Sequence, residues 1–106
     1  MPKFMICGTY TPEGLRGLQK DMGSGGERAV AAACEALSGR LDAIYWALGK
    51  DDVFAIVELP SHVHAATLGA AIGASGKVRT CIVPLLTVAE TDQALSQNVS
   101  YRPPGG

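Results

Sequence analysis

The segment from Ala47 to Pro60 constrains the fold more than any other part of the chain. It places a short polar stretch, Gly49-Lys50-Asp51-Asp52, between two apolar runs, and the second run ends at a proline. Apolar runs of strand length separated by a few turn-forming residues are typical of a β-hairpin. We therefore predict antiparallel strands over 41–48 and 53–59, with Gly49 at positive φ where the chain reverses.

A strand and a long helix are predicted before the hairpin. Residues 3–10 are apolar and extended, and Thr11-Pro12 then provides an N-cap with proline at the first helical position. Apolar residues at helical spacing continue to about Gly39. Gly23 is predicted to interrupt this helix, and Ser24 with Glu27 to restart it as a capping box.

The second half of the chain repeats the helix and strand pattern. Ser61 caps a predicted helix that Gly76 closes, a strand follows over 77–85, and Thr87 with Glu90 forms a capping box for a short helix to about Ser96. The order βαββαβ predicts an α+β, ferredoxin-like fold, with an antiparallel four-stranded sheet and helices on one face. We expect a single domain over 1–96 and a Pro/Gly-rich tail over 97–106.

Composition narrows the class of protein. A net charge of −1 argues against nucleic-acid binding, and the 106 residues contain no apolar run long enough to span a membrane. With no signal-peptide pattern at the N-terminus, the chain is expected to be soluble and cytoplasmic. Cys7, Cys34 and Cys81 are widely spaced among apolar residues, which favours small buried side chains over disulfides or metal ligands. No metal or cofactor is predicted.

Both faces of the predicted sheet are apolar. Phe54 and Ile56 point to one face of the sheet, and Val53, Ala55 and Val57 point to the other. The neighbouring strands also carry apolar residues on both faces. Helices cover only one face, so a second layer must cover the other. The segment 61–76 also carries no Asp, Glu, Lys or Arg. We expect a homodimer, or a multiple of it, formed through the open sheet face. The alternative is that the final helix and tail fold back over that face.

Several short motifs resemble a known family in their order and spacing. They are Gly8 to Gly14, Arg28, Gly39, the turn and strand from Gly49 to Pro60, and Gly76 to Thr87. Over about residues 3–95 they resemble the GYD-domain family, which is largely uncharacterised in function. The resemblance implies a ferredoxin-like fold akin to the dimeric α/β-barrel proteins, which include cofactor-free oxygenases, lactone isomerases and haem enzymes. Where the naming motif has Gly, any residue, Tyr and Asp, this chain has Asp51 at the tyrosine position.

Amphipathic and charged side chains on the apolar strands are the first candidates for a ligand site. One interpretation is a small pocket in which aromatic rings bind an apolar or aromatic molecule and an acid and a base orient it. The other is ordinary core packing for the rings and solvated edge positions for the charges. The residues concerned are Tyr10, Tyr45, Trp46, Glu58 and Arg79.

Three further segments have a functional and a structural interpretation. Residues 23–26 with Arg28 form a candidate anion site at a helix start, although a capping box by Glu27 would occupy the same N–H groups and is favoured. His64 lies on the side of its predicted helix that faces the protein core, and it could shuttle a proton or ligate haem. A hydrogen-bonded histidine near a helix start is more common. Asp51 and Asp52 are interpreted as turn formers and not as an acid–base pair.

Two classes of function remain open. The first is an oligomeric small-molecule-binding or regulatory module, favoured by the lack of a nucleophile triad, metal cluster or cofactor motif. The second is a cofactor-independent oxygenase or isomerase, in which Tyr10 and His64 would be the catalytic candidates. Whether Tyr10, Tyr45, His64 and Arg79 meet in one cavity distinguishes the two.

Overall fold

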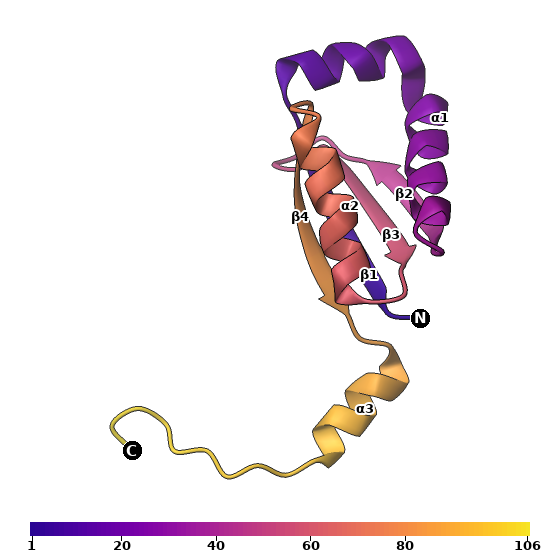
Figure 1. Ribbon diagram of the computed structural model, residues 1–106. Coiled ribbons are helices and arrows are strands. Elements are labelled where there is room, and N and C mark those ends of the chain that lie inside the picture. The colour runs from indigo at the N-terminus through magenta and orange to yellow at the C-terminus, as the bar shows by residue number, and fades with distance from the viewer.

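The computed structural model describes all 106 residues and contains one four-stranded antiparallel sheet of strand order β2-β3-β1-β4 (Figure 1). The first six elements follow the order βαββαβ, so the predicted α+β, ferredoxin-like fold is confirmed. The elements are β1 (Lys3–Tyr10), α1 (Pro12–Ala36), β2 (Arg40–Trp46), β3 (Val53–Glu58), α2 (His62–Ala74), β4 (Val78–Leu85) and α3 (Val88–Ser96).

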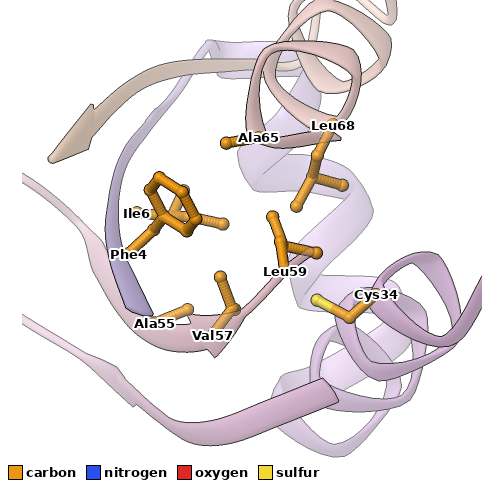
Figure 2. Packing of buried hydrophobic residues seen from close by; sticks show 8 residues of the cluster. All are labelled: Phe4, Ile6, Cys34, Ala55, Val57, Leu59, Ala65 and Leu68. Atoms are coloured by element: carbon orange, nitrogen blue, oxygen red, sulfur yellow. The ribbon is translucent and has the colours of Figure 1, made fainter. Parts of the chain in front are cut away.

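Helices α1 and α2 cover the same face of the sheet. Helix α2 packs over β4, and the second half of α1 packs along β2 (Figure 1). The core lies between these helices and the sheet. It includes Phe4 of β1, Val57 of β3, Leu59 directly after β3, and Cys34 of α1 (Figure 2). These four side chains are almost completely buried, and removal of their apolar surface from water is the main stabilising contribution of this layer.

Three of the predicted helix starts are confirmed. The hydroxyls of Thr11, Ser61 and Thr87 each accept a hydrogen bond from the backbone N–H three residues later. Thr87 also forms the complete capping box with Glu90, whose carboxylate accepts from the Thr87 N–H at 2.8 Å. This hydrogen bond lowers the pKa of the Glu90 carboxyl. The predicted closure of α2 is also present, since Gly76 adopts a φ of 71°.

The break in α1 differs from the prediction. It lies at Met22, which has φ 66° and ψ 173°, and not at Gly23. Ser24 forms no capping hydrogen bond with the Glu27 N–H, so the predicted capping box at 24–27 is wrong. The chain turns within one residue and the helix then continues, and the glycines that follow serve close packing against Trp46 instead.

The β2–β3 connection is held by carboxylates. The N–H of Ala47 donates to the carbonyl of Asp52 at 2.8 Å, which closes a loop over residues 48–51. A loop of this length needs no residue at positive φ, and the prediction for Gly49 is wrong. The Thr9 hydroxyl donates to Asp51 at 3.2 Å and the Tyr10 N–H donates to Asp52 at 2.9 Å, so both carboxylates tie the loop to β1.

The C-terminal part extends away from the sheet (Figure 1). Residues 86–106, called the arm below, include α3, which has no buried residue. The radius of gyration is 16.6 Å, compared with about 13 Å for a compact domain of 100 residues. The final helix and tail therefore do not fold back over the open sheet face. No helix combines the length and hydropathy needed to cross a membrane.

Candidate functional site

A cavity of about 370 Å³ lies between the sheet and the two helices. Small-molecule sites typically occupy about 300–1,000 Å³ and are lined mainly by apolar side chains. The lining fits this description, because most of it comes from the helix-facing side chains of the strands and from α1 and α2. Its apolar members include Ile6, Val30, Ile44, Val53, Leu68 and Ile72.

Two aromatic side chains supply an oriented polar group in the wall. The indole N–H of Trp46 donates a hydrogen bond to the hydroxyl oxygen of Tyr10, with 3.0 Å between the two heavy atoms. A tyrosine hydroxyl can accept and donate at once, so this bond leaves the Tyr10 proton available for a ligand. Polar residues Asp21, Ser75 and Lys77 also contribute to the lining.

Glycines bring the walls close to Trp46. A Cβ atom at Gly26 would lie 2.9 Å from the Trp46 ring, and one at Gly23 would lie 3.6 Å from it. Gly8 sits at the floor, where a Cβ would lie 2.7 Å from a methyl group of Val53. Contacts shorter than about 3.5 Å between carbons are repulsive, so larger residues at Gly8 or Gly26 would displace these walls. The glycine-rich stretch of α1 therefore shapes the cavity.

The predicted ligand residues divide between the two faces of the sheet. Tyr10 and Trp46 both line the cavity. Tyr45, one residue before Trp46, points to the opposite face and is 72% exposed. Arg79 is also exposed on that opposite face, because its neighbours Val78 and Thr80 line the cavity. The structure brings together the first pair only.

Glu58 belongs to an ion cluster beside the sheet edge. Arg40 Nη2 lies 2.6 Å from Glu58 Oε2, and Lys3 Nζ lies 2.6 Å from Asp42 Oδ2 and 3.7 Å from Glu58. The hydrogen bond from Lys3 lowers the pKa of the Asp42 carboxyl and raises that of the Lys3 ammonium. Arg28 is exposed on α1 and forms no ion pair. Neither Glu58 nor Arg28 lines the cavity.

His64 lies at the start of α2 and outside the cavity. Its Nδ1 lies 2.7 Å from the hydroxyl oxygen of Ser61, which also accepts from the His64 backbone N–H. His62 packs edge-on against Phe4, with ring centroids 5.3 Å apart. The arrangement at His64 matches the hydrogen-bonded histidine of the structural interpretation. The structure contains no group of three or more His, Cys, Asp or Glu side chains placed to hold a metal ion.

The sequence model of the GYD domain matches residues 4–95 of the 106-residue chain. The chain belongs to the GYD-domain family. Neither a search of curated proteins nor one of solved structures found a match. The region matched by the GYD domain includes all of the sheet except Lys3, both packed helices and every residue of the cavity, and it ends within α3.

The sequence did not predict the residues of α1, or the residue directly before β4, that complete the cavity of this GYD domain. Asp21 and Lys77 are in no predicted site, and Gly26 is predicted only as part of the anion site at 23–26. The usable signal was the density of glycine at 23–26, which was interpreted as a helix break. In the structure those glycines accommodate the only tryptophan of the chain.

Proposed function

We propose that this GYD domain is an oligomeric binding or regulatory module that holds a small apolar or aromatic molecule between its sheet and helices. The observation that supports this most directly is the apolar cavity of about 370 Å³ with the Tyr10 hydroxyl held in its wall. Apolar surface provides affinity in such sites, and a few oriented polar groups provide selectivity.

The polar group in the wall indicates the chemistry of the ligand. Trp46 occupies one lone pair of the Tyr10 oxygen, and the remaining proton can be donated to an acceptor on the ligand. A carbonyl, quinone or lactone oxygen on a flat ring is such an acceptor. Ligands with an acceptor oxygen should therefore bind better than hydrocarbons of equal size, because a hydrocarbon would displace water from the half-buried Tyr10 hydroxyl without accepting its proton.

The open sheet face supports the oligomeric part of the proposal. By strand register its apolar members point away from the helices, and nothing in the chain covers them. The arm adds large exposed apolar side chains at Leu86, Val88 and Leu95. A second copy of the chain presents an apolar sheet face of the same shape and would cover this surface. The open face comprises Met5, Cys7, Ala43, Tyr45, Phe54, Ile56, Cys81, Val83 and Leu85.

A cofactor-independent oxygenase or isomerase is the second candidate. It is favoured by the same hydroxyl, since an oriented phenol in an apolar cavity can move a proton to or from a bound substrate. In that case Tyr10 would be the catalytic group. His64 would need a contact with substrate that this cavity does not offer, because it is not part of the lining.

The fluorescence of Trp46 tests the proposal directly, because it is the only tryptophan and lies in the cavity wall. Quinones, phenols and lactones of one or two rings should shift or quench its emission saturably. They should also compete with a fluorescent apolar dye such as an anilinonaphthalene sulfonate. If no compound changes the emission and none displaces the dye, the binding function is wrong. Chromatography of the same mixtures after incubation in air detects any product and separates enzyme from binding module.

A further inference from the structure

Two of the three cysteines lie directly opposite each other on neighbouring strands. Cys7 of β1 pairs with Cys81 of β4 in the antiparallel register. Both point to the open face, because Ile6 and Gly8 on one strand and Thr80 on the other line the cavity. Both thiols are free.

The register determines how far apart the two residues are. The Thr11 N–H donates to the Lys77 carbonyl at 2.9 Å, and positions two residues apart in an antiparallel ladder share the same bonding type. Cys7 and Cys81 therefore occupy a hydrogen-bonded pair, in which Cα atoms lie about 5.5 Å apart. Disulfides span Cα separations of about 4.4–6.8 Å, but they also need the Cβ atoms to approach to about 3.8 Å. A bond here would form under strain, and strained disulfides are reduced easily.

The two thiols differ in exposure. Cys81 is exposed on the edge strand of the sheet, whereas Cys7 is only 9% exposed. Burial raises the pKa of the Cys7 thiol, and the nearby Asp51 carboxylate and Cys81 raise it further. Redox-sensing cysteines are solvent-accessible and often lie beside a resolving cysteine, and Cys81 and Cys7 have these two features. Cys34, by contrast, is fully buried in the core (Figure 2).

We propose that Cys81 and Cys7 form a reversible disulfide between β1 and β4 in response to a hydroperoxide. The Cys81 thiolate attacks one oxygen of hydrogen peroxide, the O–O bond breaks, and the leaving hydroxide takes a proton to become water. Cys81 is then a sulfenic acid. The Cys7 thiolate attacks its sulfur, the S–O bond breaks, a second water leaves, and the S–S bond forms. The peroxide gains two electrons, one from each sulfur.

This disulfide site is independent of the proposed ligand, because it lies on the opposite side of the sheet from the cavity. Its product would cross-link an edge strand to the centre of the sheet on the open face. Because the proposed second copy would cover that same face, the oxidation takes place in a chain whose open face is uncovered. Failure of ligand binding would leave the cysteine chemistry untouched, and failure of the disulfide would leave the ligand result untouched.

The test begins with the reduced, desalted full chain treated with hydrogen peroxide. Thiols counted in denaturant should fall from three to one, and peptide mass spectrometry should find Cys7 linked to Cys81 within one chain. Cys34→Ser is the matched control and should lose both of its remaining thiols at the same rate. Cys7→Ser should stop at a Cys81 sulfenic acid that dimedone traps. Reduced glutathione should restore both thiols without denaturant.

Several outcomes would overturn the proposal. One is oxidation of wild-type Cys81 to sulfinic acid, or to a disulfide between two chains, while Cys7 stays free. Another is retention of all three thiols by the wild-type chain at a peroxide concentration that does oxidise Cys81 in Cys7→Ser. Diamide, which joins thiol pairs without a sulfenic acid, is the second oxidant. Free Cys7 and Cys81 after both oxidants would show that the two sulfurs do not meet.

Discussion

Trp46 and Tyr10 are joined by a hydrogen bond although their strands are not neighbours in the sheet. The indole nitrogen lies 3.0 Å from the hydroxyl oxygen, and β3 separates β2 from β1. Val53 of β3 pairs with both Trp46 and Gly8, and the missing side chain at Gly8 leaves room above it. The bond thus bridges the floor of the cavity, and its two members are the sequence-predicted ligand residues that meet there.

Removal of the Tyr10 hydroxyl should weaken binding of ligands that carry an acceptor oxygen. We expect Tyr10→Phe to lose about fivefold to tenfold in affinity, since one hydrogen bond contributes roughly 1 kcal/mol. Titration followed by Trp46 fluorescence measures this loss. Tyr101→Phe, an exposed tyrosine of the arm, is the matched control and should bind as wild type. Equal affinities for Tyr10→Phe and wild type would remove the hydroxyl from the site.

A methyl group added at Gly14 should destabilise the fold, whereas one added at Gly17 should not. Both glycines lie in α1, but a Cβ at Gly14 would collide with the backbone carbonyl of Lys77, and one at Gly17 would meet no atom within 4 Å. We expect Gly14→Ala to cost about 2 kcal/mol or more and Gly17→Ala to stabilise by up to about 1 kcal/mol. Urea unfolding measures both. Equal effects would contradict the packing of α1 against the start of β4.

Relief of the backbone strain at Met22 should stabilise the protein. Its φ of 66° with ψ of 173° lies in a region that glycine occupies freely and other residues occupy at a cost of about 1–3 kcal/mol. Met22→Gly should therefore raise the free energy of unfolding by about 1 kcal/mol. Met22→Ala keeps the strained backbone and removes the same exposed side chain, so it should give no gain. A stabilised Met22→Ala would assign the effect to the side chain instead.

A charge on the open face should dissociate the proposed oligomer. Ile56→Lys places an ammonium at the centre of that face, where burial against a second copy would be strongly unfavourable. Light scattering should then report a mass near 11.0 kDa, with unchanged circular dichroism. Val63→Lys is the matched control on the outer surface of α2, where Val63 is exposed, and it should leave the mass as in wild type.

Two results would correct this picture. Dissociation by Val63→Lys alone would place the contact on α2, whose outer residues Ala66, Ala70 and Gly73 are also small and exposed. A folded wild-type monomer at micromolar concentration would show that no second copy covers the open face.

Local signals in the sequence determined the order of elements and most of their ends. The caps at Thr11, Ser61 and Thr87 need only a hydroxyl and a backbone N–H three residues away, so three or four residues are sufficient to predict them. The βαββαβ order follows in the same way, from the lengths of apolar runs and the turns between them. The match to the GYD domain covers residues 4–95, which contain nearly all of these elements.

Tertiary packing alone decided the site. Strand periodicity places Tyr45 and Trp46 on opposite faces, but both parities are apolar, so the sequence could not show which one the helices cover. The break of α1 at Met22 likewise depends on distant contacts, because the second half of the helix must reach Trp46 through Gly23 and Gly26. A strained residue beside an available glycine cannot be predicted from local preference. It persists because packing across the cavity compensates for its cost.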